Sequence, residues 1–309
     1  MIFTVTLNPA LDKTVTLPGF AVNTVNRAQT IRLDPGGKGI NVSKTIRSLG
    51  GKTLVLGVLG GATGGYIKSA LDALDIDNDM VLTGENTRTN IKIVDPALGT
   101  NTDINEPGLP ISQANMQAVW NKLTDKVQPG DTVVFAGKNP PGMADDQLAR
   151  WIAELKRLDV RVCVDTVGLP MTLALEQGPD IIKPNREELS ELVGRKLITD
   201  QEILKVGKEL VAEGIGLAAV SMGSGGAIFI TRDQVIRGYS PKVVVASTVG
   251  AGDAMMAALA HYTAAGCSLE ETARRAIAVA TASVTYAGSQ APELDRILPL
   301  IDKVRIEKL

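Results

Sequence analysis

Residues 247–253 of the chain read STVGAGD, and the small-residue run AMMAALA follows them at residues 254–260. The apolar run KVVVA at residues 242–246 precedes them and predicts a strand. A strand, a glycine-containing turn and a helix in this order place several unpartnered backbone N–H groups at one helix start. The helix dipole is positive there and glycine admits close approach, so we predict that this turn binds an anion such as phosphate.

Asp253 stands beside this predicted anion hole, which Gly250, Ala251 and Gly252 would form. A carboxylate in this place can take a proton from a hydroxyl group, so we predict a phosphoryl-transfer site with Asp253 as its general base. The helix dipole should favour the ionised carboxylate and make it only a modest base. The plain alternative is a helix cap, because aspartate near a helix start often has no other role.

The composition limits the classes of protein to which the chain can belong. Its 309 residues, 44% hydrophobic and 21% charged with 31 glycines, suit one large core or two ordinary domains of α/β type. A net charge of −2, no basic tract longer than two residues and 3% aromatic residues argue against a nucleic-acid partner.

Other features of the sequence indicate the cellular compartment of the protein. Cys163 and Cys267 lie far apart, which fits a reducing compartment better than a disulfide scaffold. The first nine residues, MIFTVTLNP, resemble a strand and not a signal peptide. No apolar run is long enough to span a bilayer, so we expect a cytoplasmic protein without a membrane partner.

The hydrophobic pattern predicts an α/β fold with a doubly wound, mostly parallel sheet. From residue 112 onward, predicted helices at 112–126, 145–158 and 200–213 alternate with predicted strands at 132–136, 161–165 and 217–222. No internal repeat or linker is present, so we expect residues 1–309 to form a single domain.

Two segments depart from this regular alternation. Residues 13–34 contain short alternating runs separated by Pro-Gly and Val-Asn breaks, which predict antiparallel strands outside the βαβ units. Residues 88–106 contain a further strand pattern at 90–94 and a polar loop with Asn105. We expect both segments to meet in one small sheet beside the main one.

Several Gly-rich turns should converge at the edge of the main sheet where parallel strands end. The expected acceptor side of the site comprises Asp12, Gly37, Lys38, Asn41 and Arg88. The expected donor side comprises Lys183, Asn185, Glu188, Ser221, Gly223 and Gly226. Asp253 would lie between them, although a turn residue at Asp12 and a plain Gly-rich turn around Gly37 remain alternatives.

Metal and nucleophile chemistry based on histidine is excluded, because the only histidine is His261 in an alanine-rich helix. The Gly51-Lys52-Thr53 tripeptide is no Walker A loop, since Ile46 stands where that loop needs glycine. No G-x-G-x-x-G fingerprint occurs. Asn185 and Glu188, three residues apart at a helix start, suit Mg²⁺ held partly through water, or are an ordinary solvated helix start.

These motifs together resemble the PfkB (ribokinase-like) carbohydrate kinase family over essentially the whole chain. The runs GGKGINVS at 36–43 and TVGAGD at 248–253 resemble its two signatures, and KPNREE at 183–188 resembles its N-x-x-E element. The runs TVTLNPALD at 4–12, VNR at 25–27 and DINEPG at 103–108 resemble the phosphosugar branch, first 1-phosphofructokinase and then tagatose-6-phosphate kinase. This branch implies phosphorylation of fructose 1-phosphate by ATP. A catalytically silent sugar or nucleotide sensor on the same fold is the alternative from another class.

The resemblance implies a role for each matching residue, with Asp253 as the base. Residues implied to contact the phosphosugar are Asp12, Arg27, Gly37, Lys38, Asn41, Arg88, Asn105 and Lys138. Residues implied to border ATP are Lys183, Asn185, Ser221, Gly223, Ser224, Gly225, Gly226 and Gly252. Residues implied to serve cations are Asn185 and Glu188 for Mg²⁺, and the Ser247 and Val249 carbonyls for K⁺.

The resemblance also implies a lid built from residues 13–34 and 88–106, which pairs with a second lid in a homodimer and excludes water when it closes. One motif departs from the branch. Residues 136–142 read AGKNPPG where S-G-S-L-P-P-G is usual, so Lys138 replaces a serine expected near the substrate. This lysine could add a phosphate contact or alter the acceptor.

Overall fold

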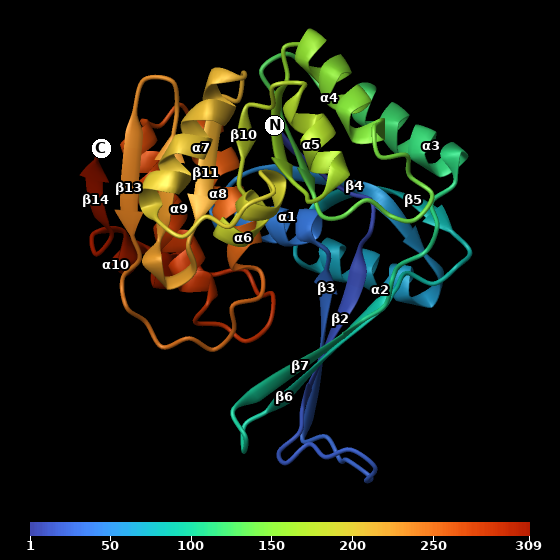
Figure 1. The fold of residues 1–309 in the computed structure, drawn as a ribbon. Helices are drawn as coiled ribbons and strands as arrows, with labels where there is room; N and C mark the ends of the chain where they lie inside the picture. The colour runs from blue at the N-terminus through green and yellow to red at the C-terminus, as the bar shows by residue number, and fades with distance from the viewer.

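A ten-stranded sheet forms the centre of the structure, a computed structural model that describes residues 1–309 (Figure 1). Its strand order is β14-β13-β12-β11-β10-β9-β8-β1-β4-β5. The strands from β5 to β11 are parallel, and the remaining three are antiparallel. The bounds are β1 (Ile2–Thr6), β4 (Thr53–Gly60), β5 (Asp77–Thr83), β8 (Thr132–Ala136), β9 (Arg161–Asp165), β10 (Ile181–Ile182), β11 (Leu217–Ser221), β12 (Ala227–Ile230), β13 (Val235–Tyr239) and β14 (Arg305–Lys308).

Helices cover both faces of this sheet, which confirms the doubly wound prediction. One face carries α3 (Gln113–Thr124), α4 (Gln147–Arg157), α5 (Leu169–Leu175), α6 (Arg186–Leu192) and α7 (Asp200–Ala212). The other face carries α1 (Lys38–Ser48), α8 (Ala251–Ala264), α9 (Leu269–Ser283) and α10 (Leu294–Ile301). Helix α2 (Gly61–Ala73) packs near the β4–β5 edge. No helix combines the length and the hydropathy that a membrane span requires.

A four-stranded sheet projects from this body as an arm, and we call it the lid (Figure 1). Its order is β3-β2-β6-β7, with β2 (Ala10–Thr16), β3 (Thr30–Gly36), β6 (Thr89–Asp95) and β7 (Thr100–Asn105). Strands β2 and β3 pair antiparallel, as expected for residues 13–34, and both segments meet in one sheet, in which β2 and β6 pair in parallel. Both strands leave the main sheet after parallel strands, β1 and β5, and therefore run outward in the same direction.

Two local expectations need correction. Residues 242–246 form no strand, because β13 already has β12 and β14 as neighbours. This segment is an irregular connector to α8, with Val244 90% exposed. Asp12 lies within β2 of the lid and not in a turn after β1. The lid itself thus brings Asp12 to the edge of the main sheet.

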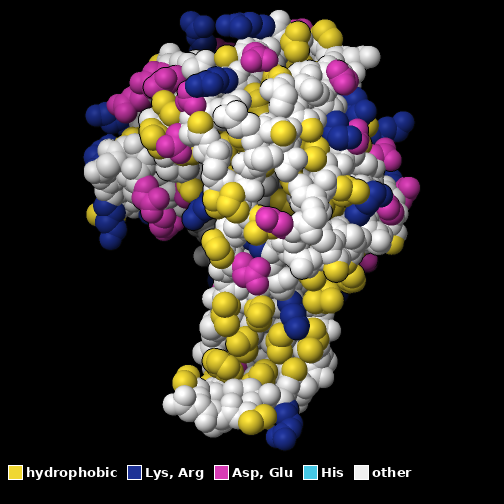
Figure 2. Space-filling model, turned by 90° about the vertical axis from the view of Figure 1, so that its right-hand side faces the viewer, with side chains coloured by type: hydrophobic (Ala, Val, Ile, Leu, Met, Phe, Trp, Pro, Cys, Tyr) yellow, Lys and Arg dark blue, Asp and Glu magenta, His cyan; other side chains and the backbone are white.

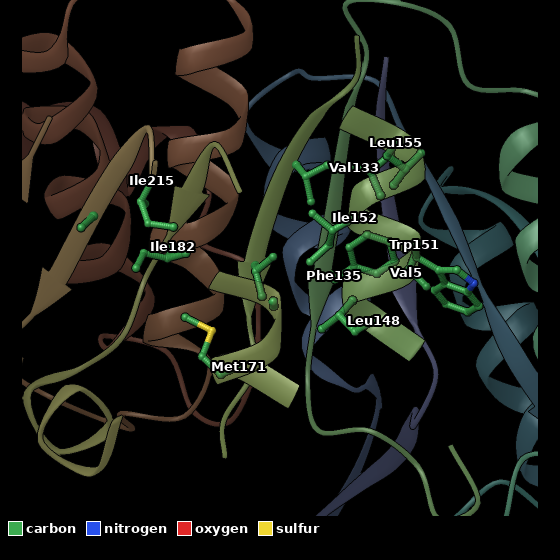
Figure 3. Close-up of a cluster of buried hydrophobic side chains, with 14 of the residues drawn as sticks. Val5, Val133, Phe135, Leu148, Trp151, Ile152, Leu155, Met171, Ile182 and Ile215 are labelled. Atoms are coloured by element: carbon green, nitrogen blue, oxygen red, sulfur yellow. The ribbon is translucent and has the colours of Figure 1, made fainter. Parts of the chain in front are cut away.

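The larger hydrophobic cluster shows how the sequence pattern builds this body (Figure 3). On β8, Val133 and Phe135 face one helical layer, and the intervening Val134 faces the other. On α4, Leu148, Trp151, Ile152 and Leu155 follow an i, i+3, i+4, i+7 spacing. Trp151 stacks on Trp120 of α3 with ring centroids 5.1 Å apart.

Leu155→Ala should therefore lower the free energy of unfolding by about 2–5 kcal/mol, because the side chain is fully buried and its removal leaves a cavity. Leu158, at the end of the same helix and 46% exposed, supplies the matched control. Leu158→Ala should cost less than about 1 kcal/mol. Urea denaturation followed by circular dichroism measures both values, and equal losses would contradict this description of the core.

Candidate active site

A cavity of about 970 Å³ lies between the carboxyl ends of the parallel strands and the base of the lid. It is lined by most of the residues selected from the sequence, including Asp12, Lys38, Lys183 and Asp253. The predicted residues that do not line it are Arg27, Lys138, Gly225 and Ser247. Both the expected acceptor side and the expected donor side therefore face one continuous space.

Asp253 lies in the first turn of α8, after Gly250 in the left-handed conformation with φ of 82°. Its side chain is buried, and the Asn41 amide Nδ2 donates a hydrogen bond to Oδ2 at 2.9 Å. Burial and the nearby Asp165 carboxylate raise the pKa of Asp253 to about 6, against the opposing effects of Lys38, Asn41 and Lys183. The sequence analysis expected an acidic carboxylate, whereas the pKa of Asp253 lies above its ordinary value of 3.8. Asp253 is a stronger base than the sequence suggested.

Asp165 is the main residue that the sequence analysis missed. It ends β9, is buried, and lies between Lys38 Nζ at 3.1 Å from Oδ1 and Lys183 Nζ at 3.5 Å from Oδ2. Burial alone would raise the pKa of Asp165, but the two lysines lower it, so this carboxylate stays ionised. Its position at the carboxyl end of a buried strand was the signal available in the sequence.

The acceptor side has a second carboxylate with its own support. Asp12 Oδ1 accepts a hydrogen bond from Asn90 Nδ2 at 3.0 Å, and Oδ2 accepts one from Ser289 Oγ at 3.3 Å. Burial raises the pKa of Asp12. Lys44, also missed, donates from its buried ammonium to the carbonyls of Pro35 at 2.9 Å and Ser289 at 2.8 Å. Lys44 thus joins helix α1 to the end of β3 and to the segment that contacts Asp12.

The three predicted cations of the acceptor side differ in position. The Arg88 guanidinium lines the cavity but donates to the carbonyls of Asn8 at 3.1 Å, Pro9 at 3.3 Å and Glu106 at 2.9 Å. It therefore fastens the base of the lid to the body. Arg27 is exposed in the loop at the far end of the lid, and Lys138 is exposed outside the cavity.

A glycine turn borders the donor side. Gly226 has φ of 93°, and a Cβ there would lie 2.1 Å from the Gly238 carbonyl oxygen, so only glycine fits. The buried Arg237 side chain holds this turn by donating to the Gly225 carbonyl at 2.9 Å and to Asp200 Oδ2 at 3.0 Å. Gly225 supports the turn without lining the cavity.

Asn185 and Glu188 form a capping box at the start of α6 and also line the cavity. The Asn185 side-chain oxygen accepts from the Glu188 N–H at 2.8 Å, and Glu188 Oε2 accepts from the Asn185 N–H at 2.8 Å. Asn185 and Glu188 therefore cap the start of α6, as the alternative to a Mg²⁺ site proposed, and they also face the cavity. No group of three or more His, Cys, Asp or Glu side chains has a geometry that could hold a metal ion.

Comparison with known proteins identifies the family to which the chain belongs. The model of the pfkB family carbohydrate kinases matches residues 5–296. The chain belongs to this family. It is 39% identical to a 1-phosphofructokinase of Rhodobacter capsulatus, with 100% of this chain and 98% of the relative aligned, and 36% identical to one of Borreliella burgdorferi, with 100% and 99% aligned.

Solved structures of PfkB kinases share the fold. Phosphofructokinase-2 from Escherichia coli in complex with substrates and products superposes with a TM-score of 0.94 at 30% identity, with 98% of both chains covered. A ribokinase of Arabidopsis thaliana, at 24% identity and a TM-score of 0.77 over 97% and 98% of the chains, shares the fold alone. The family resemblance expected from the sequence is thereby confirmed.

Asp253→Asn should stabilise the folded protein at pH 7.5 by about 3 kcal/mol, because the native state binds a proton at this carboxylate more readily than the unfolded chain does. In the parent protein, the unfavourable free energy of burying the ionised Asp253 carboxylate is fully present above about pH 6. It disappears below the ordinary pKa of 3.8, where the carboxyl group is protonated in both states. Urea denaturation at pH 7.5 and near pH 4 measures this difference. Asp233→Asn, at an exposed site, is the control, and an Asp253→Asn variant no more stable than its parent at pH 7.5 would refute the burial penalty.

Proposed function

We propose that the protein is an ATP-dependent sugar-phosphate kinase that converts fructose 1-phosphate and ATP to fructose 1,6-bisphosphate and ADP. The observation that carries this proposal is the buried carboxylate of Asp253 beside the glycine turn at the start of α8. The full-length 1-phosphofructokinase relatives support the same acceptor.

Asp253 would take the proton of the sugar hydroxyl as the O–P bond forms. Its pKa of about 6 leaves it ionised at neutral pH and makes it a stronger acceptor than an ordinary aspartate. The backbone N–H groups of residues 250–252 point to the same end of the helix and would stabilise charge on the transferred phosphoryl group. The remaining contribution of the protein to catalysis would be to align the sugar hydroxyl with the phosphate of ATP.

The acceptor side would hold the sugar through Asp12, Gly37 and Asn41, with Lys38 between the sugar and the transferred phosphoryl group. Asn41 supports this assignment, because its buried Oδ1 has no partner within the protein and can accept from a hydroxyl. Asn105, on the edge strand β7 of the lid, also lines the cavity. Arg27 could reach a substrate only after a movement of the lid.

The donor side would hold ATP along the turn at residues 223–226, with Lys183 near the phosphates. Mg²⁺ would neutralise phosphate charge there, and Glu188 fits it through water because Oε1 is free of the capping box. The Asn185 oxygen is engaged in that box, so its contribution would be to fix Glu188. The Ser247 and Val249 carbonyls would serve K⁺, a proposal supported by the potassium complex of Escherichia coli phosphofructokinase-2.

The lid has one apolar face, which we propose pairs with the lid of a second chain in a homodimer. Figure 2 shows hydrophobic side chains gathered on this arm of the molecule. Cross-strand pairs place Val15 beside Ile31 and Ile93, and Ile31 and Ile104 are 58% and 52% exposed. A second lid would remove this surface from water. The pairing would make the lid residues 13–34 and 88–106 part of both the site and the interface.

A coupled ADP-release assay with fructose 1-phosphate, tagatose 6-phosphate and fructose 6-phosphate tests the function. We expect the highest kcat/KM with fructose 1-phosphate. Asp253→Asn, purified in the same way, controls for contaminating kinases and should lose about 10²–10⁴-fold in kcat with little change in ATP affinity. A preference for tagatose 6-phosphate would support the nearest rival. ATP binding without turnover of any of these sugars would indicate a sensor.

Ile31→Asp should convert the homodimer to a chain of 32.5 kDa in analytical ultracentrifugation, because a charge on the apolar face must be desolvated in the pair. Leu74→Asp introduces the same charge at a site 49% exposed on the end of α2 and should leave the dimer intact. A monomeric parent protein, or an Ile31→Asp variant that remains dimeric, would count against pairing through the lid.

A further inference from the structure

The cavity-facing side of the lid carries a lysine to which the roles above give no function. Lys92 lies on β6 and, like Asp103 on β7, lines the cavity. Its Nζ lies 2.9 Å from Asp103 Oδ1. The side chain of Lys92 is 15% exposed, while that of Asp103 is 49% exposed. A largely covered ammonium group with one half-exposed partner therefore faces the proposed sugar site.

The register of the lid places Lys92 relative to the sugar residues. One row across the strands holds Asp34, Asp12, Asn90 and Asn105, and the next row on the same face holds Arg32, Thr14, Lys92 and Asp103. Rows two residues apart are separated by about 7 Å along a strand. Lys92 is thus one row farther from the body than Asp12 and Asn90, on the order of the length of a hexose. A sugar whose hydroxyls meet Asp12 would extend its far end toward Lys92.

Two of the other cations near this end of the site, Arg88 and Arg32, are committed elsewhere, whereas Lys13 lines the cavity from the intervening row of β2. Arg88 donates to three backbone carbonyls at the base of the lid and, at 3.5 Å, to Asn90 Oδ1. Arg32 Nε donates to Asp34 at 2.7 Å and its terminal nitrogen to the Ala287 carbonyl at 2.6 Å, and this residue does not line the cavity. Lys92 has a single ionic partner, and a partly exposed ion pair is weak enough for its carboxylate to be exchanged for another anion. A phosphate dianion is a stronger partner than one carboxylate.

We propose that Lys92 is a specificity-determining residue that binds the phosphate group already present on the sugar. Asp103 holds the ammonium group over the cavity until that phosphate replaces it. An unphosphorylated sugar offers no anion to open the pair, so the exchange selects phosphosugars. This inference rests on the proposed kinase function and identifies Lys92 as the residue that would distinguish phosphorylated from unphosphorylated sugars.

The test compares two variants with opposite expected effects. Lys92→Met should raise the KM for fructose 1-phosphate about 10–100-fold, the usual range for a lost hydrogen bond to a charged group, with the KM for ATP unchanged. Asp103→Asn should lower the KM for fructose 1-phosphate, because it frees the ammonium group and removes a charge that repels phosphate. Lys92→Arg should retain most of the affinity, since a guanidinium also binds phosphate.

Lys68→Met is the matched control. It removes another Lys–Asp pair of 2.9 Å, that between Lys68 and Asp72 on α2, which lies outside the cavity. Neither KM should change in this variant. An unchanged KM for fructose 1-phosphate in Lys92→Met would overturn the inference. So would a rise of both KM values in Lys92→Met, or a higher KM for fructose 1-phosphate in Asp103→Asn, because either result would make the pair a structural brace.

The parent protein separates this inference from the proposed function. If it turns over fructose 1-phosphate and Lys92→Met has an unchanged KM, only the role of Lys92 fails. If the parent turns over no phosphosugar, the kinase function fails first. In that case isothermal titration of fructose 1-phosphate into the parent and Lys92→Met still measures the phosphate contact, and equal affinities would overturn it.

Discussion

A carboxylate held out of water at the start of a helix is the constraint on which the rest of this structure depends. Burying Asp253 is unfavourable, and a second buried carboxylate, Asp165, makes it more so. Lys38 and Lys183 offset this cost by pairing with Asp165. The four side chains come from α8, β9, α1 and the segment after β10. The packed α/β body must therefore hold these elements in register to keep the two buried carboxylates and their neutralising cations together.

The main sheet and the lid meet different physical requirements. The main sheet is covered on both faces, so its strands are apolar and its site residues lie only at strand ends. One face of the lid is polar and lines the cavity, and the other carries apolar residues such as Val15 and Ile31, so its strands alternate accordingly. Asp12 and Lys92 occupy successive rows on the polar face. A thin sheet can thus carry cavity-lining polar residues and an apolar surface on alternate positions of the same strands.

Much of the candidate site was predictable because glycine turns and strand ends are encoded locally. The turn around Gly250 and the helix start at Asn185 and Glu188 depend on residues close in sequence, and both were expected, although the capping box itself was not. Asp165 and Lys44 were missed, because each has a partner far away in the sequence: Lys38 is 127 positions from Asp165, and Ser289 is 245 positions from Lys44. A lone aspartate at a strand end and a lysine within a helix carry no local sign of such pairing. The pKa of Asp253 could not be predicted either, since burial depends on every element around it.

The sequence by itself determined the family, the alternation of strands and helices, and most of the selected residues that line the cavity. These follow from motifs and periodicities that span fewer than about ten residues. Only the tertiary structure decided that residues 242–246 remain outside the sheet, that β2 and β6 run in parallel, and that the Arg88 guanidinium is engaged by carbonyl groups. Each of these outcomes depends on which distant segments compete for the same hydrogen-bonding positions, and that competition is settled only when the whole chain is packed.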